Sequence, residues 1–149
     1  MREIKFRIWD DRIKKMGIVT ELRYSEVQYH LVKYRYTDER GRTIDNQTHF
    51  DKGYSGGITL MQYTGVNDNN DTEIYEGDIL EWSRKDLKTG ETNKEMFEVV
   101  FIDGAFMGMN IKNYNPKYQL LNDIVSWCDC EFTKLIGNIY ENPELLETN

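Results

Sequence analysis

The stretch Thr64–Ile79, TGVNDNNDTEIYEGDI, says most about the fold of this 149-residue chain. Consecutive Asn and Asp residues, as in Asn67–Asn70, are typical of hairpin turns. Their oxygen-bearing side chains also raise the alternative of a calcium loop. An EF-hand loop needs Gly at its sixth position and Glu at its twelfth, but counting from Asp68 these positions hold Glu73 and Ile79. The stretch therefore predicts a hairpin turn, and no metal site.

Short strand patterns lie on both sides of this turn, from residue 58 to the end of the chain. They are Ile58–Tyr63, Ile74–Ser83, Glu95–Asp103, Ala105–Ile111 and Glu131–Tyr140. Asp103-Gly104 has the composition of a tight hairpin turn, and Gly137 within the last strand indicates a bulge. Asn142 followed by Pro143 predicts a short C-terminal helix. Short strands at this spacing favour a small barrel or sandwich.

The first 57 residues predict a second β-rich subdomain. Glu3–Trp9 alternates charged and bulky residues like a half-buried strand, and Met16–Val19 can return beside it. Leu22–Tyr36 favours strand because it is rich in Tyr and Val, while a helical start over Glu21–Tyr29 remains open. Thr37–Asp45 is polar and contains a glycine, which indicates a turn or loop.

The glycine-rich segment Asp51–Gly57 is the best candidate boundary, and it divides the chain into subdomains 1–57 and 58–149. Gly53-Tyr-Ser55-Gly-Gly57 also matches the G-x-S-x-G pattern of α/β-hydrolases. That motif needs a strand before it, a helix after it and a later histidine. Here a strand follows, and both histidines precede Ser55. A glycine-rich loop explains the match, so the sequence predicts no catalytic residue and a protein that is not an enzyme.

Composition predicts a globular protein of the cytoplasm. The chain is 39% hydrophobic and 13% aromatic, which is too rich for a disordered chain. No apolar run approaches the roughly 18–20 residues of a membrane span, and the charged N-terminus lacks the apolar centre of a signal peptide. Cys128 and Cys130 are the only cysteines. A structural zinc site needs four ligands and both histidines lie far away, so we expect free thiols and no cofactor.

Charge is distributed unevenly along the chain. Residues 1–55 carry a formal charge of +3 and residues 56–149 carry −10, which together give the net −7. The acidic part repels phosphate backbones, so unaided nucleic-acid binding there is not expected. The asymmetry is compatible with contact between unlike parts of two subunits, or simply with solvated faces.

A Tyr-rich stretch supplies the candidate interaction residues, which are Tyr29, Lys33, Tyr34, Arg35 and Tyr36. Aromatic rings interleaved with cations are typical of strands on which nucleic-acid bases stack. A tyrosine-rich strand that packs into a core or a subunit interface has the same composition. We favour the core or interface, and keep a nucleic-acid-associated regulator as the alternative.

Three segments resemble the YopX-like family of phage and prophage proteins of Gram-positive bacteria. They are Arg2–Asp10 with Lys15-Met16, Met61–Gly65 with Glu73–Ile79, and Ile136–Leu145. They lie at the start, middle and end, so the resemblance covers nearly the whole chain. It implies a mainly β (α+β) architecture with an SH3-like barrel in residues 58–149, and it implies self-association. It brings no catalytic residues.

Several residues of these segments have structural interpretations. Gly65 and Gly77 suit positive φ or close strand approach, and Asp78 can accept hydrogen bonds from backbone donors in a turn. Tyr75 and Tyr140 are expected in the core or a seam. We therefore expect a non-catalytic phage accessory protein, a homo-oligomer that binds an unidentified phage or host protein.

Overall fold

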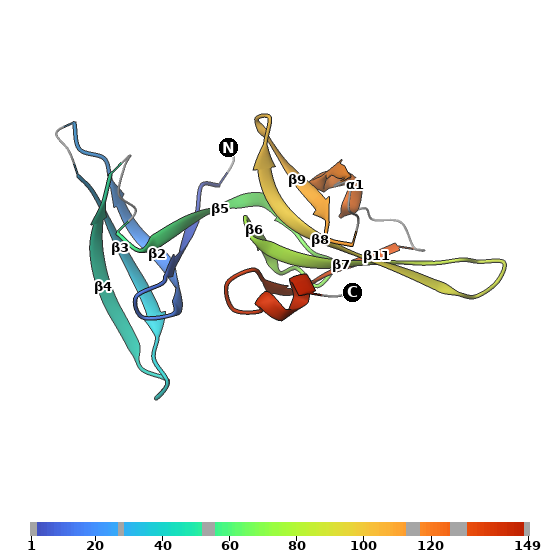
Figure 1. The fold of residues 1–149 in the computed structure, drawn as a ribbon, viewed down its shortest axis with the longest axis horizontal. Helices are drawn as coiled ribbons and strands as arrows, with labels where there is room; N and C mark the ends of the chain where they lie inside the picture. The colour runs from blue at the N-terminus through green and yellow to red at the C-terminus, as the bar shows by residue number, and fades with distance from the viewer. Residues whose placement is uncertain (1–2, 27–28, 52–55, 113–116, 126–130, 148–149) are drawn as a thin grey trace. The chain divides into compact units, whose positions relative to one another are not determined.

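The computed structural model describes residues 3–26, 29–51, 56–112, 117–125 and 131–147. Within them the chain forms antiparallel β-sheets, one short α-helix and one 3-10 helix. The strands are β1 (Phe6–Asp10), β2 (Lys15–Arg23), β3 (His30–Thr37), β4 (Thr43–Phe50), β5 (Ile58–Asn67), β6 (Glu73–Tyr75), β7 (Asp78–Lys85), β8 (Thr92–Ile102), β9 (Ala105–Asn110), β10 (Tyr118–Leu120) and β11 (Glu131–Asn138). The helices are α1 (Leu121–Ile124) and the 3-10 helix η1 (Pro143–Glu147). Figure 1 shows this order along the ribbon.

The chain divides into two compact units, Glu3–Gln62 and the part from Tyr63 onward. We call them the N-terminal and the C-terminal unit. The division falls within β5, whose first residues pair with β1 and whose last residues pair with β6. The boundary predicted at Asp51–Gly57 lies upstream of this point, and residues 52–55 of it are outside the described residues.

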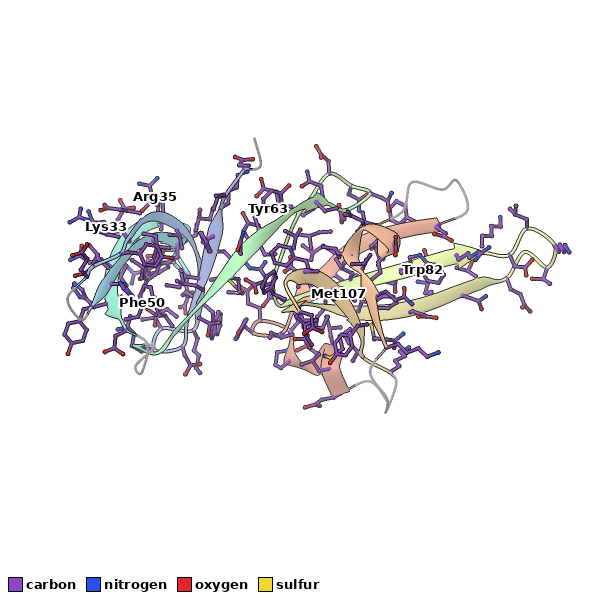
Figure 2. The ribbon with its side chains drawn as sticks, turned by 90° about the horizontal axis from the view of Figure 1, so that it is seen from above. Lys33, Arg35, Phe50, Tyr63, Trp82 and Met107 are labelled. Atoms are coloured by element: carbon purple, nitrogen blue, oxygen red, sulfur yellow. The ribbon has the colours of Figure 1, made fainter. Side chains whose placement is uncertain are left out.

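The N-terminal unit is an antiparallel sheet in the order β4-β3-β2-β1-β5. Side chains along its strands alternate between the two faces of the sheet, as in half-buried strands. The buried core consists of Ile8, Val32, Tyr34 and Ile58. Figure 2 shows the sheet curving, with Phe50 on its inner side, and Phe50 packs against this core. The curvature lets a single sheet bury a core.

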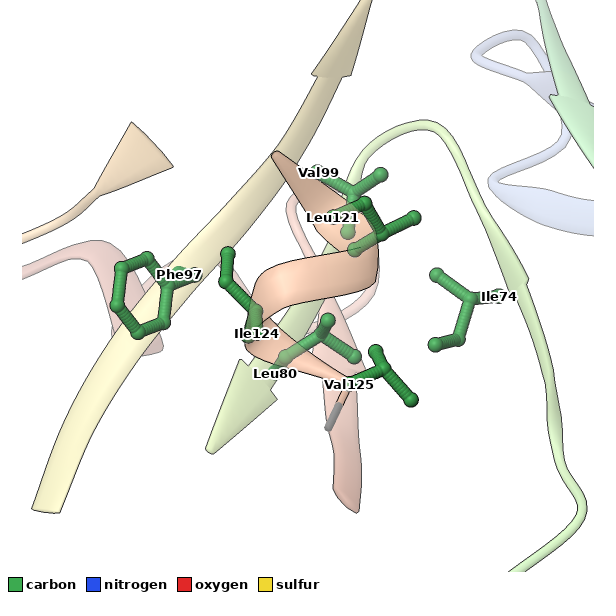
Figure 3. Close-up of a cluster of buried hydrophobic side chains, with 7 residues drawn as sticks. All are labelled: Ile74, Leu80, Phe97, Val99, Leu121, Ile124 and Val125. Atoms are coloured by element: carbon green, nitrogen blue, oxygen red, sulfur yellow. The ribbon is translucent and has the colours of Figure 1, made fainter. Parts of the chain in front are cut away.

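The C-terminal unit contains an antiparallel sheet in the order β10-β9-β8-β7-β11. Its core consists of Ile74, Leu80, Phe97, Val99, Leu121, Ile124 and Val125. Figure 3 shows α1 directing Leu121 and Ile124 into this cluster. Gly108 of β9 makes the packing possible, because a Cβ there would lie 2.1 Å from Cδ1 of Ile124.

Mainly β architecture is confirmed, but the SH3-like barrel is not. The two edge strands of the C-terminal sheet, β10 and β11, do not pair with each other in the described part of the chain, so the sheet is open. The C-terminal helix is not confirmed as an α-helix, because Pro143–Glu147 form five residues of 3-10 helix.

Local predictions from turn chemistry are confirmed. Asp103 and Gly104 both have positive φ, 51° and 81°, in the hairpin between β8 and β9. The pairing of β11 with β7 shifts register between Leu135 and Gly137, which is the predicted bulge.

The structure differs from the predicted bounds at two places and decides an alternative that the sequence left open at a third. The predicted strand Ile74–Ser83 is two strands, because the chain turns at Glu76-Gly77. The possible helix over Glu21–Tyr29 is excluded at its start, where residues 21–23 belong to β2. The loop predicted over Thr37–Asp45 ends early, since Thr43 already begins β4. The inward residues of β4 include Asn46 and Thr48, so its pattern is not that of an apolar strand.

Candidate interaction surface

The candidate residues of β3 lie on two faces of the strand. Tyr34 is 1% exposed and belongs to the core, and Tyr36 packs against that core. Lys33 and Arg35 alternate with them and lie on the outer side of the sheet (Figure 2). Tyr29, before the strand, is 53% exposed. The structure therefore does not place the tyrosines and the cations of this strand on one surface.

Both cations of β3 are held in ion pairs. Lys33 Nζ lies 2.6 Å from Oε2 of Glu21, and Arg35 Nε lies 2.7 Å from Oδ1 of Asp45. These carboxylates lie on the neighbouring strands β2 and β4. Their negative charge offsets the positive charge that a phosphate backbone would meet.

Tyr34 closes a polar network around the fully buried Asp10. The Asp10 carboxylate accepts hydrogen bonds from Arg12 Nε at 2.9 Å, from Arg12 Nη2 at 2.7 Å, and from the Tyr34 hydroxyl. Asn46 Nδ2 donates to the Tyr34 hydroxyl oxygen at 2.8 Å. Burial acts to raise the pKa of Asp10, but the hydrogen bonds from Arg12 and Tyr34 outweigh it and lower that pKa. Burial and the hydrogen bond to Asp10 raise the pKa of Tyr34 to about 12.

The Asp-Asn segment after β5 covers the outer edge of β11. Asp68 is buried, and its Oδ1 accepts the N–H groups of two residues of its own loop. Its Oδ2 accepts the Leu135 N–H at 2.8 Å. The Asn69 N–H donates to the Thr133 carbonyl at 3.0 Å, and Asn69 Oδ1 accepts the Thr133 N–H at 2.6 Å. These bonds occupy backbone groups that an edge strand otherwise leaves open to other chains.

The turn between β6 and β7 connects three parts of the C-terminal unit. Gly77 has φ of 75°, its N–H donates to the Val99 carbonyl at 2.8 Å, and its carbonyl accepts the Ile139 N–H at 2.9 Å. Asp78 Oδ2 accepts the Tyr75 N–H at 2.7 Å within the turn. Positive φ explains why glycine occupies position 77.

The other motif residues lie around this turn or at register changes. Gly65 has φ of 85° within β5. A Cβ at Gly77 would lie 3.4 Å from the ring of Tyr140. Gly137 leaves room for Asn142, whose Oδ1 a Cβ at position 137 would meet at 2.4 Å. These residues organise the C-terminal unit.

In the described ranges, no group of three or more His, Cys, Asp or Glu side chains is placed to hold a metal ion. No helix of the same ranges is long and apolar enough to span a bilayer. Cys128, Cys130 and the segment Gly53–Ser55 of the G-x-S-x-G match lie outside the described residues.

The second face of the C-terminal sheet is apolar. On β8, Phe97 and Val99 point into the core, so the alternating side chains point to the opposite face. Cross-strand register extends this face over β9 and β10. We call it the methionine face, and it consists of Met96, Glu98, Val100, Met107, Met109, Tyr118 and Leu120. Met107 is labelled in Figure 2.

Glu98 lies in the middle of the methionine face. Its cross-strand neighbours are Ile79 on β7 and Met109 on β9, and its same-face neighbours along β8 are Met96 and Val100. All four are apolar, and no described residue provides it with a hydrogen bond or an opposite charge. Burial raises the pKa of Glu98, because the ionised carboxylate is poorly solvated there.

Glu81, on the same side of the sheet, has a different environment. Its carboxylate lies 3.1 Å from Lys94 Nζ and 3.2 Å from Lys134 Nζ. Burial acts to raise the pKa of Glu81, but the two lysines outweigh it and lower that pKa. One carboxylate of this side is therefore neutralised within the chain, whereas Glu98 is not.

A small pocket lies between β5, the start of β9 and the start of α1. It has a volume of about 190 Å³ and is lined by Thr64, Val66, Ala105, Phe106, Leu120, Leu121 and Asn122. Leu120 belongs to both the pocket and the face, and it is 51% exposed. Its lining combines apolar side chains with the polar Thr64 and Asn122.

Sequence reasoning did not identify the methionine face. Met96, Glu98 and Val100 alternate with Phe97 and Val99, but both sets are largely apolar. The alternation therefore does not say which set faces the core. Only the packing of α1 against one side of the sheet decides that.

The fold and this surface define a class, namely two-unit antiparallel β proteins with an apolar sheet face in the C-terminal unit. The chain belongs to the YopX protein family, whose sequence profile matches residues 5–147. This confirms the resemblance seen in the sequence.

A solved structure supports the same fold. The chain is similar to protein EF1440 from Enterococcus faecalis, a crystal structure, with 26% sequence identity and a TM-score of 0.53. The alignment covers 98% of this chain and 99% of that chain. A search of curated proteins found no significant match.

Proposed function

We propose that this chain is a non-catalytic binding or assembly module of the YopX family, which binds a phage or host protein through the methionine face. We propose that it does so in the cytoplasm of a bacterial host. The observation that carries it is an apolar face on three adjacent strands around a carboxylate without a described counter-charge. Methionine side chains are flexible and polarizable, and they are common on surfaces that adapt to partners.

A non-catalytic role is supported by three carboxylates whose hydrogen bonds stabilise the fold. Asp10 joins β1 to β3 through Tyr34 and holds Arg12 of the turn after β1, and Asp68 holds a loop onto β11. Asp78 accepts a backbone hydrogen bond in a turn. Each of these carboxylates holds the fold together, as structural carboxylates do.

Capture from phage-infected host cells tests the binding role. The parent chain is compared with the double variant Met107→Gln, Met109→Gln, which keeps side-chain length but makes the face polar. Ile18→Gln is the control, because Ile18 is 68% exposed on the N-terminal sheet. We expect a partner that binds the parent and Ile18→Gln but not the double variant, with all three folded by circular dichroism. Equal capture by all three would contradict the proposal.

Self-association is a second part of the proposal. No described strand pairs with the outer edge of β4, and its sequence TIDNQTHF contains neither Lys nor Pro. Natural edge strands commonly use those residues to prevent pairing with another chain. We expect an oligomer by light scattering. A strict monomer at high concentration would contradict this part alone.

A further inference from the structure

The carboxylate of Glu98 within the methionine face, unpaired among the described residues, indicates the chemistry of a partner that covers this face. A partner that is only apolar would remove water from Glu98 and leave its carboxylate buried without an opposite charge. Such burial is costly, whereas pairing with a cation offsets the cost. On the same side of the sheet, the carboxylate of Glu81 is paired with two lysines of this chain.

We infer that the methionine face binds an apolar protein segment that carries a lysine or arginine, whose charge pairs with Glu98. The inference rests on the proposed function and specifies the partner. Residues 56–149 carry a formal charge of −10, which attracts a basic segment and repels an acidic one. Glu98 then selects the partner, while the methionines and Leu120 supply apolar contact.

The register of the three strands also indicates where the basic and the apolar residues of such a segment would bind. Glu98 on β8 is the cross-strand neighbour of Met109 on β9. Val100 on β8 is likewise the cross-strand neighbour of Met107. Met107 is next to Leu120 on β10, which lines the pocket. A segment with a basic residue over Glu98 can therefore cross β9 and place an apolar side chain against Leu120.

A library of random twelve-residue peptides, displayed and selected on the full-length chain, tests the inference. Selection on the parent is compared with selection on Glu98→Gln and on Met107→Gln, Met109→Gln. Glu91→Gln is the matched control, because it removes one negative charge from an exposed loop residue just before β8. Binding of selected peptides is then measured, with the methyl signals of the methionines as a reporter of position.

We expect peptides selected on the parent to contain Lys or Arg among apolar residues and to shift the methyl signals of Met96, Met107 and Met109. Met16 and Met61, in the N-terminal unit, are internal controls. Replacing the basic residue of a peptide by glutamine should weaken binding to the parent about tenfold or more, because the desolvated carboxylate of Glu98 then lacks an opposite charge. On Glu98→Gln the same replacement should have little effect, and Glu91→Gln should behave like the parent.

The contrary outcomes separate the inference from the proposed function. If selected peptides shift those three methyl signals but show no preference for a basic residue, the inference is wrong and the binding role remains. If selection fails on the parent, or is unchanged on Met107→Gln, Met109→Gln, both are wrong. Shifts of the three signals on dilution without peptide would identify a second copy as the occupant, and would also overturn the inference.

Discussion

Single residues show how this chain uses buried polar groups. Asp10 is fully buried, and its hydrogen bonds to Arg12 and Tyr34 compensate the loss of water. Glu98 is half-buried among apolar neighbours without such compensation. The two carboxylates therefore have pKa values shifted in opposite directions, lowered for Asp10 and raised for Glu98.

Tyr34→Phe tests the buried network. The variant keeps the ring in the core but removes the hydroxyl, so Asp10 loses a donor and Asn46 Nδ2 loses its acceptor. We expect the free energy of unfolding to fall by about 1–3 kcal/mol, the usual cost of unsatisfied buried groups. Urea denaturation measures it. Tyr36→Phe is the control on the same strand, and an equal loss in both variants would contradict a special role for the Tyr34 hydroxyl.

Glu98→Gln tests the uncompensated carboxylate through pH. A raised folded-state pKa means that Glu98 contributes stability below its ordinary pKa near 4.5, and that this contribution is lost as pH rises through the folded-state value. The neutral variant should therefore be more stable than the parent at pH 7, and the difference should shrink toward pH 4. Denaturation curves at several pH values measure it. A variant less stable than the parent at pH 7 would show that Glu98 has a stabilising partner.

At the scale of elements, strand edges and sheet faces are closed by segments distant in sequence. The loop after β5 covers the edge of β11 through Asp68 and Asn69. Helix α1 covers one face of the C-terminal sheet, and Gly108 provides the space for Ile124. Turn chemistry predicted the hairpin at Asp103-Gly104, because the preference for positive φ is local to those two residues. The edge contacts join residues more than 60 positions apart, so no local pattern reveals them.

Asp68→Ala tests the edge contact. The substitution removes the acceptor of three backbone N–H groups, two in the loop and one at Leu135 of β11. At roughly 1–3 kcal/mol for each unsatisfied buried donor, we expect a loss of stability of at least about 2 kcal/mol. Hydrogen exchange should also become faster at Leu135 and Thr133. Asn70→Ala is the control, because Asn70 is an exposed residue of the same loop that contacts Asp68 only through its backbone N–H. Unchanged exchange in β11 of Asp68→Ala would contradict the role of the loop.

At the scale of the whole molecule, the distribution of charge affects which kinds of partner the chain attracts. The chain carries a net charge of −7, and Lys33 and Arg35 of the candidate nucleic-acid strand lie in ion pairs with Glu21 and Asp45. Ion pairing and net negative charge both weaken attraction to a phosphate backbone.

We therefore expect no retention of single-stranded or double-stranded nucleic acid at low salt in a gel-shift assay. The double variant Lys33→Ala, Arg35→Ala is the matched comparison. If the parent binds with an affinity that falls steeply with salt, and the double variant does not bind, the alternative of a nucleic-acid-associated regulator would replace the binding module.

The sequence by itself determined the family, the mainly β character and the turn geometry. These rest on local information, such as the order of Asp and Gly in a hairpin or the motifs that span Thr64–Ile79. Tertiary structure alone decided that the sheet of the C-terminal unit stays open, that β4 is a strand, and that Tyr34 is a core residue. It also decided that Glu98 and the methionines form a face. The physical reason is that alternation assigns side chains to two faces, while only packing against other elements determines which face is buried.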